Sequence, residues 1–568
     1  MIVKFRLSFC IALLLFVARV AIGQEAMRSV VGGPDPLSIA APDPLSIAAP
    51  TGLVERAGDR SVILHWEPVS APDLVGYQVY RALTDTAAYE RRNPSLVTTN
   101  HFVDFDVHNG HTYSYRVRTM ALSGKESPDS AAVGATPEAL DDDAFLDLVQ
   151  HTAFDYFWYE ANPDNGLIRD RSIDTSPSNI AAVGFGLSAL TVGSDRGWIS
   201  REAARQRVRT TLTFFFKSPQ GPEADATGYK GFYYRFLDMQ TGRRTWNVEL
   251  SSIDTALLLA GVLHVQQYFD QDNPAEAEIR ALAEALYRRV DWRWMQVRPP
   301  KISHGWRPET GFLPYDWRGY SEAMILYLLA LGSSTSPVSG AAWEAWTSTY
   351  AWETHYGHAF VVFPPLFGHQ YTHTWIDFRG LQDAFMRDKG IDYFENSRRA
   401  TLANRAYAIA NPQGWQDYNE NMWGITASDI CMDYTARGAA PVLNDDGTVA
   451  PTAPGGSFAF TPHMSLAALR HMYDAYRTQL WGSYGFKDAF NPSANWFSSS
   501  YLGIDQGPIV LMIENARSGR IWDVTMRSAA IQRGLQQAGF MPAPVDDKVC
   551  TAMVTTPVLE ANTGKREH

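Results

Sequence analysis

Carboxylates recur among aromatic residues between residues 170 and 505 of this 568-residue chain. Trp246 precedes Glu249, and Glu420 precedes Trp423. Acids ordinarily avoid aromatic surroundings, because burying a charge without a partner is costly. A site that holds sugar rings needs this mixture, since flat aromatic faces cover C–H surfaces while carboxylates bind hydroxyls and transfer protons. The pattern therefore predicts a carbohydrate-active enzyme.

Three acids are the candidate catalytic residues. Glu249 follows Trp246 and opens an apolar run, where it could simply be a first-turn acid stabilised by the helix dipole. Apolar, aromatic surroundings would instead favour its protonated form, which a general acid near neutral pH requires. Asp170 and Asp174 lie on a loop bounded by Gly, Pro and Ser. There they could pair with the neighbouring arginines or activate a water molecule, because functional residues concentrate on loops.

A second group of residues could contact a sugar chain. Residues 415–429 combine tryptophans with acids, which fits sugar stacking and ordinary packing equally well. Asp316-Trp317, Glu322 and Asp505 are weaker candidates, which could be no more than helix caps. The candidate substrate-binding residues are Trp246, Asp316, Trp317, His373, Trp375, Arg379, Glu420, Trp423 and Asp429.

Other chemistries are disfavoured. His369 and His373 are four residues apart, but no acid completes a metal-binding helix motif, so a core or loop pair is expected. Gly184-Phe-Gly186 lacks the apolar strand of a dinucleotide site, and small residues at a helix–helix contact explain it better. We therefore expect neither a metal nor an organic cofactor.

The composition is that of an ordinary globular protein, with 45% hydrophobic and 19% charged residues. A net charge of −12 disfavours nucleic acid or an anionic membrane as partner. A neutral polysaccharide suits this charge better than a polyuronate, and we expect a monomer. Cys431 and Cys550 could form one bridge, which the sequence leaves open.

The N-terminus has the features of an export signal. Lys4 and Arg6 precede a short apolar run, and Ala21-Ile-Gly23 offers a cleavage site. No later run is long and apolar enough to span a bilayer, so we expect an exported protein, periplasmic or extracellular, with no membrane contact after cleavage. The expected organisation is a signal peptide at 1–23, a Pro-rich linker with a duplicated octapeptide at 24–49, an all-β domain at 50–137, a helical domain at 141–540 and a tail at 541–568.

Short alternating runs at 61–66, 76–80 and 112–118 predict strands of a β sandwich. Residues 50–137 resemble a fibronectin type III domain, because they contain Trp66 and a tyrosine, Tyr113 or Tyr115, that would serve as the tyrosine corner. We expect this domain to be a spacer. From residue 141 the period becomes helical, and about twelve segments with long connections predict an (α/α)6 barrel. They lie near 143–160, 179–194, 200–217, 249–270, 275–290, 321–332, 341–353, 375–388, 393–411, 463–478, 505–517 and 523–538.

Several long motifs then identify a family by resemblance. They are Thr245–Asp254, Leu313–Glu322, Phe363–Asp377, Gly482–Asn491 and Gly503–Trp522. Residues 143–540 resemble the bacterial glycoamylase-like domains of glycoside hydrolase family 144. The resemblance implies an (α/α)6 barrel that hydrolyses β-1,2-glucan to sophoro-oligosaccharides with inversion. It also implies Glu249 as proton donor and Asp170 or Asp174 as base, with Asp429 in reserve.

Alternatives to an endo-acting β-1,2-glucanase remain open. An exo-acting, sophorose-releasing enzyme or a β-glucan hydrolase for another linkage would keep the class and change the substrate. A polysaccharide lyase needs a positive pocket for a uronate, which the cleft acids and the net charge oppose. A non-catalytic glycan-binding protein would use the same acids structurally.

Overall fold

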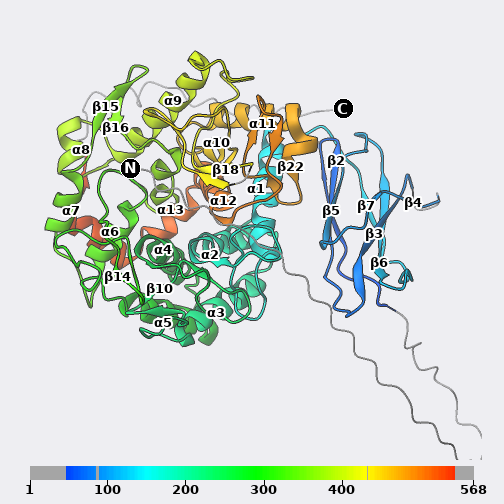
Figure 1. Ribbon diagram of the computed structural model, residues 1–568, viewed down its shortest axis with the longest axis horizontal. Coiled ribbons are helices and arrows are strands. Elements are labelled where there is room, and N and C mark those ends of the chain that lie inside the picture. Colours follow the sequence, from blue (N-terminus) through cyan, green and yellow to red (C-terminus); the bar gives the residue numbers. More distant parts are fainter. Residues whose placement is uncertain (1–46, 85–87, 432, 544–568) are drawn as a thin grey trace, which may run out of the picture. The chain divides into compact units, whose positions relative to one another are not determined.

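The computed structural model describes residues 47–84, 88–431 and 433–543 (Figure 1). The predicted signal peptide and most of the predicted linker and tail lie outside the described residues, as does Cys550. Cys431 is exposed, and the question of its pairing with Cys550 stays open because Cys550 lies outside the described residues. Across the described ranges, no helix combines the length and hydropathy that crossing a bilayer requires.

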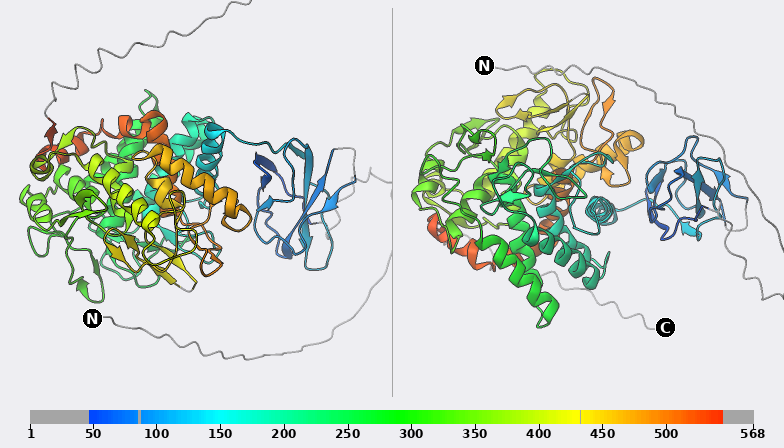
Figure 2. Two further views of the ribbon diagram at one scale, coloured as in Figure 1. Left: turned by 90° about the horizontal axis from the view of Figure 1, so that it is seen from above. Right: turned by 60° about the horizontal axis from the view of Figure 1, so that its bottom comes forward.

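The first part of the described chain is all β, and its two antiparallel sheets enclose a core of their own (Figure 2). The three strands predicted from sequence are present as β2, β3 and β6. Trp66 and Tyr77 pack edge to face in this core. Of the two tyrosines predicted for a tyrosine corner, Tyr113 contacts the backbone a few residues upstream, since its hydroxyl accepts a hydrogen bond from the His108 N–H at 3.0 Å. One sheet contains β1 (Val54–Gly58), β2 (Ser61–His65) and β5 (His101–Asp104); the other contains β4 (Glu90–Arg91), β3 (Leu74–Ala82), β6 (Tyr113–Ala121) and β7 (Val133–Ala135).

The second part is mostly helical, and its helices are of two kinds. Helices α2, α4, α6 and α12 are buried almost all round, whereas α3, α5, α11 and α14 bury one face. The buried helices contact one another, with α2 between α4 and α12, and α4 against α6 (Figure 1). The helices are α1 (Asp142–Tyr159), α2 (Ile180–Asp195), α3 (Arg201–Lys217), α4 (Ser252–Tyr268), α5 (Pro274–Arg288), α6 (Met324–Gly332), α7 (Ala341–Thr347), α8 (Ala384–Lys389), α9 (Tyr393–Ala410), α10 (Thr452–Gly456), α11 (Pro462–Leu480), α12 (Gly503–Ser518), α13 (Arg520–Thr525) and α14 (Ala529–Gln537).

Short β ribbons lie in the connections between the helices. They include β8 (Ser178–Asn179) with β11 (Phe236–Leu237), and β12 (Leu250–Ser251) with β13 (Gly305–Arg307) and β14 (Gly311–Phe312). Further along lie β18 (Ser428–Ile430) with β19 (Asp433–Thr435), and β24 (Phe490–Asn491) with β25 (Trp496–Phe497).

Some predicted elements differ from the structure. The segment 375–388 is helical only in α8, because two 3₁₀ turns, Leu366–His369 and Thr372–Thr374, lead into an irregular stretch. The segment 523–538 is broken into α13 and α14. The predicted tail begins in a strand, since β26 (Met541–Pro542) pairs with β17 (Leu381–Gln382).

Candidate active site

A cavity of about 300 Å³ opens where the N-termini of the buried helices meet. Asn179 caps α2 and Ser251 caps α4, and both line this cavity, as does Glu322 just ahead of α6. Ile504 in the first turn of α12 completes this side of the wall. The positive ends of several helix dipoles therefore point toward one cavity, which favours acidic side chains there. We call this space the central cavity.

Among the carboxyl groups of the central cavity, that of Glu322 has the pKa that burial shifts most clearly. Its Oε2 is buried and has no hydrogen-bond partner among the described residues. Burial raises the pKa of Glu322 to about 7, and the nearby Asp254 carboxylate adds to this rise while Arg235 opposes it. A carboxyl group that is about half protonated at neutral pH can donate a proton.

Arg235 is the cation of the cavity wall. Its Nε lies 3.8 Å from Asp254 Oδ2, and Asp254 also accepts a hydrogen bond from the Ser251 hydroxyl. Burial raises the pKa of Asp254, although the Arg235 charge and the Ser251 hydrogen bond oppose the rise. The Asp254, Glu249 and Asp170 carboxylates together raise the pKa of the Arg235 guanidinium, so it stays charged.

Glu249 lines the central cavity, but its surroundings differ from those predicted. Its Oε2 is 3.1 Å from an Arg307 guanidinium nitrogen. Trp246 does not enclose it, since Trp246 is 64% exposed and packs edge-on against Phe236. Trp246 therefore does not supply the apolar cover predicted for Glu249, and the cavity carboxyl whose pKa burial raises to about 7 is that of Glu322.

The loop with Asp170 and Asp174 separates the two acids. Asp170 is buried and accepts a 2.8 Å hydrogen bond from Asn179, which itself lines the central cavity. Asp174 is exposed and borders a different pocket, together with His101 and Glu160. Of the two acids, Asp170 alone lies next to the central cavity.

Asp429 belongs to a buried acidic group behind Asp170. Arg171 bridges the two, with 3.7 Å from its Nε to Asp170 and 3.3 Å from its terminal nitrogen to Asp429. The Asp429 N–H donates to Asp488 at 2.7 Å. Burial and the neighbouring Asp488 raise the pKa of Asp505 well above its usual range, and burial raises the pKa of Asp488 to about 6. Asp488 thus disfavours the ionisation of Asp505.

Comparisons with known proteins identify relatives of this chain. The Glycoamylase family model matches residues 314–529. An exo β-1,2-glucooligosaccharide sophorohydrolase (non-reducing end) of Parabacteroides distasonis is 32% identical over 517 residues, which is 85% of this chain and 70% of that protein.

Solved structures extend the likeness to three dimensions. A β-1,2-glucanase from Parabacteroides distasonis has a TM-score of 0.78 at 30% identity, covering 89% of this chain and 74% of that one. An endo-β-1,2-glucanase from Chitinophaga pinensis, in complex with sophorotriose and glucose, has a TM-score of 0.66 at 31% identity, covering 71% of this chain and 99% of that one. The chain belongs to glycoside hydrolase family 144, the glycoamylase-like glycosidases.

In this family 144 hydrolase, one predicted sugar-contacting tryptophan lines the central cavity. Trp317 stacks on His304 with ring centroids 3.9 Å apart and donates its N–H to the Ser252 hydroxyl at 3.0 Å. Its neighbour Asp316 pairs with Arg298 at 2.7 Å and does not line this cavity.

Three predicted contact residues of the hydrolase lie in its core instead. His373, Trp375 and Trp423 are at most 1% exposed, so none of them can reach a sugar in this structure. Trp375 donates to Ser188 and stacks on Phe185, while His373 bonds Ser397. These interpretations were wrong, because an aromatic-rich sequence has the same appearance in a core as in a binding site.

The other predicted contacts of the hydrolase lie at its surface. Arg379 is held by Asp377 at 2.7 Å and covers the ring of Trp522. Glu420 is exposed on a loop, and neither residue lines the central cavity. Within the described ranges, no group of three His, Cys, Asp or Glu side chains could hold a metal ion.

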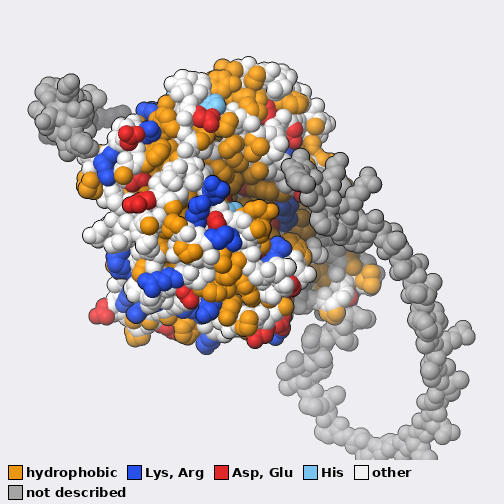
Figure 3. All heavy atoms as spheres, turned by 60° about the vertical axis from the view of Figure 1, so that its left-hand side comes forward, with side chains coloured by type: hydrophobic (Ala, Val, Ile, Leu, Met, Phe, Trp, Pro, Cys, Tyr) orange, Lys and Arg blue, Asp and Glu red, His pale blue; other side chains and the backbone are white. Residues whose placement is uncertain are grey.

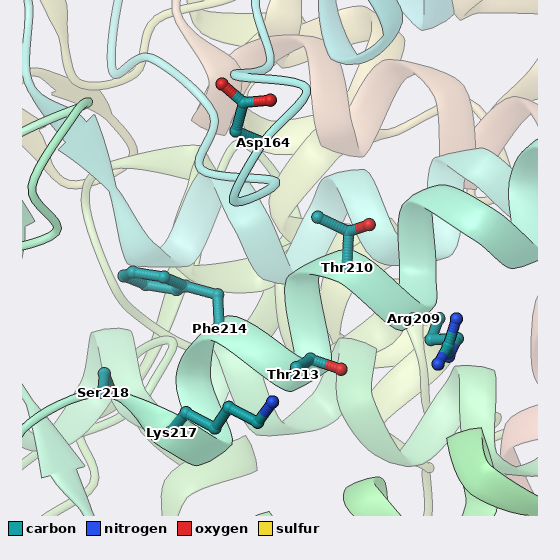
Figure 4. Close-up of a pocket in the computed structure, with 7 residues that line it drawn as sticks. All are labelled: Asp164, Arg209, Thr210, Thr213, Phe214, Lys217 and Ser218. Carbon is teal, nitrogen blue, oxygen red and sulfur yellow. The ribbon is translucent and has the colours of Figure 1, made fainter.

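A further pocket of the hydrolase lies along α3 and is lined by Asp164, Arg209, Thr213 and Lys217 among others (Figure 4). It holds a single carboxylate, so it lacks the pair that glycoside hydrolysis requires. On the face shown in Figure 3, basic side chains are interspersed with acidic and neutral ones.

Proposed function

We propose that this glycoside hydrolase cleaves β-1,2-linked glucan and releases sophoro-oligosaccharides. Its relatives act on β-1,2-glucans, and the Chitinophaga pinensis relative was solved with sophorotriose. The observation that carries the proposal for this chain is the central cavity, which Glu322 lines together with other carboxylates. Burial raises the pKa of Glu322 there. The helical part forms an (α/α)6 barrel, and the β part is a fibronectin type III-like domain. The protein acts as an exported monomer.

The mechanism we propose is inversion with Glu322 as the acid. Glu322 protonates the leaving oxygen, directly or through a sugar hydroxyl, because its carboxyl retains a proton near neutral pH. Asp170 takes a proton from the attacking water, and the Asn179 amide holds its carboxylate in place. Glu249, paired with Arg307, remains the alternative acid.

Exo attack with release of sophorose is the second candidate. It is supported by the Parabacteroides distasonis relative, whose name specifies an exo enzyme and whose match covers 85% of this chain. The endo-acting Chitinophaga pinensis relative covers only 71% of the chain. Time courses of product length distinguish the two modes, since endo attack produces intermediate lengths early and exo attack produces sophorose throughout.

The test is product analysis on linear β-1,2-glucan with wild type, Glu322→Gln, Glu249→Gln, and the matched pair Asp170→Asn and Asp174→Asn. We expect wild type to release sophoro-oligosaccharides and Glu322→Gln and Asp170→Asn to lose activity at least about 100-fold. Asp174→Asn should stay near wild type. The wild-type rate should fall as the pH rises through about 7, because Glu322 then loses its proton.

Other outcomes would change the proposed substrate, acid or base. If wild type leaves the polymer and its oligosaccharides intact, the substrate is wrong and other β-glucans must be tried. If Glu249→Gln is inactive while Glu322→Gln retains activity, the acid is Glu249. If Asp174→Asn is the inactive member of its pair, the base is Asp174.

A further inference from the structure

A second cavity, of about 440 Å³, adjoins the central cavity. The two cavities share Tyr434 of strand β19 as a common wall. Trp496 and Phe497 of strand β25 also line it, as do Ser498, Ser499 and Ser500, which follow them in the chain. We call this second cavity the Trp496 pocket.

The Trp496 pocket is built on fixed elements. Strand β25 pairs with β24 through Asn491 opposite Trp496, and the rings of Phe490 and Phe497 are stacked at 5.8 Å. Its floor contains the buried carboxylate of Asp429, which is 6% exposed. A pocket held in this way does not need to reorganise before it binds a ligand.

Every charged group of the floor is compensated. Arg171 lies 3.3 Å from Asp429, and the hydroxyls of Ser498 and Ser500 each donate to Asp429 Oδ2 at 3.3 Å. The pocket thus offers hydroxyls and a neutralised ion pair, together with the exposed carboxylate of Asp433. This chemistry suits a neutral, hydroxyl-rich ligand better than an anion, because a carboxylate accepts hydrogen bonds from hydroxyls and repels negative charge.

The walls of the Trp496 pocket supply flat apolar surface as well. Trp496 is partly exposed, Tyr434 is 38% exposed, and Ile173 at the rim is 44% exposed. Aromatic faces beside hydroxyl groups match the two sides of a glucose ring. Since Arg171 also lies 3.7 Å from Asp170, a chain in this pocket would pass close to the proposed base.

We infer that the Trp496 pocket binds glucose units of the β-1,2-glucan chain beyond those held in the central cavity. The inference rests on the proposed function, and it makes the enzyme prefer longer chains. Trp496 is then a specificity-determining residue that contacts the chain away from the cleaved bond.

The experiment compares Trp496→Ala with Trp352→Ala on a ladder of β-1,2-glucooligosaccharides and on the polymer. Trp352 is a matched control, because it is also a partly exposed tryptophan on a two-stranded hairpin and lines neither cavity. For Trp496→Ala we expect kcat/KM on the polymer to fall about ten-fold, mainly through KM, and to fall much less on the shortest cleaved substrate. Trp352→Ala should keep the wild-type ratio.

The outcomes separate this inference from the proposed function. If wild type cleaves no member of the ladder, the proposed function fails. If wild type cleaves it but Trp496→Ala keeps the wild-type ratio of polymer to short-substrate kcat/KM, the inference about the pocket fails. Binding of the polymer to the Glu322→Gln protein, with and without Trp496→Ala, gives a second readout; equal affinities would also overturn the inference.

Discussion

The Glu322 carboxyl should make the protein less stable at alkaline pH. Its pKa is raised from 4.5 to about 7 in the folded protein, so the folded state binds more protons than the unfolded state between these values. Stability contributed by the protonated form is therefore lost as the pH rises through this window. Replacing Glu322 with the neutral Gln should raise the free energy of unfolding at pH 8 by up to about 3 kcal/mol and change it little at pH 4.5. The thermal unfolding midpoint at each pH measures this difference.

Glu420→Gln is the control for this measurement, because Glu420 is an exposed glutamate away from the cavity. It should behave as wild type at both pH values. A Glu322→Gln protein that is no more stable than wild type at pH 8 would show that the carboxyl is well solvated, and would remove the reason for assigning it as the acid.

For single residues, the sequence could predict only some of the acids that lie at the central cavity. Glu249 and Asp170 could be found because they stand beside aromatic residues and on a loop, and both lie at or next to the central cavity. Glu322 ranked low because a position ahead of a helix also suits a cap. Its unusual environment comes from Asp254 and Arg235, which are about 70 to 90 residues away in the sequence, and no local pattern reports such neighbours.

At the scale of elements, the packing of α2 against α4 fixes where the helix N-termini lie. A Cβ on Gly184 would meet the Leu257 carbonyl oxygen at 2.2 Å, and one on Gly261 would meet the Gly184 oxygen at 2.1 Å. The sequence interpretation of Gly184 as a small residue at a helix–helix contact is therefore confirmed.

Gly184→Ala should force α2 and α4 apart and destabilise the protein by about 1–3 kcal/mol, despite the better helix propensity of Ala. Because Asn179 and Ser251 cap these two helices at the cavity, activity should fall as well. Thermal unfolding and kcat/KM measure the two effects. Gly134→Ala in β7 is the control, since a Cβ there has its nearest neighbour at 4.0 Å. Equal midpoints for both variants would refute tight packing at Gly184.

Element types could be predicted further than element ends. Long periodic helices such as α1, α3 and α9 follow from their apolar spacing. The helix α10 was missed, because Pro451, Pro454 and two glycines are typical of a loop, and burial against α12 holds it in place. The predicted helix at 341–353 ends at Thr347, since Trp352 begins strand β15 (Trp352–His355).

At the scale of the whole described chain, the β part and the helical part have separate hydrophobic cores, and the β part contacts α1 and α11. Arg56 of strand β1 lies 2.8 Å from Asp155 of α1 and also contacts His151. His65 of β2 stacks on Tyr159 at 4.3 Å, and Ser61 bonds Tyr473 at 3.1 Å. The domain predicted to be a spacer thus buries charged and aromatic groups of the first helix.

Removing Arg56 should weaken this junction in a way that depends on pH. Burial raises the pKa of Asp155 to about 6, and the Arg56 guanidinium limits the rise. Without Arg56 the pKa of Asp155 rises further, so its charged form becomes more costly as the pH increases through 6. Arg56→Met should therefore destabilise the protein by about 3 kcal/mol at pH 8 and by less at pH 5, where Asp155 is protonated in both proteins. Arg91→Met on exposed strand β4 is the control. A pH-independent loss in thermal unfolding would mean that Arg56 acts through packing of its aliphatic stem, and that the junction is not held by its charge.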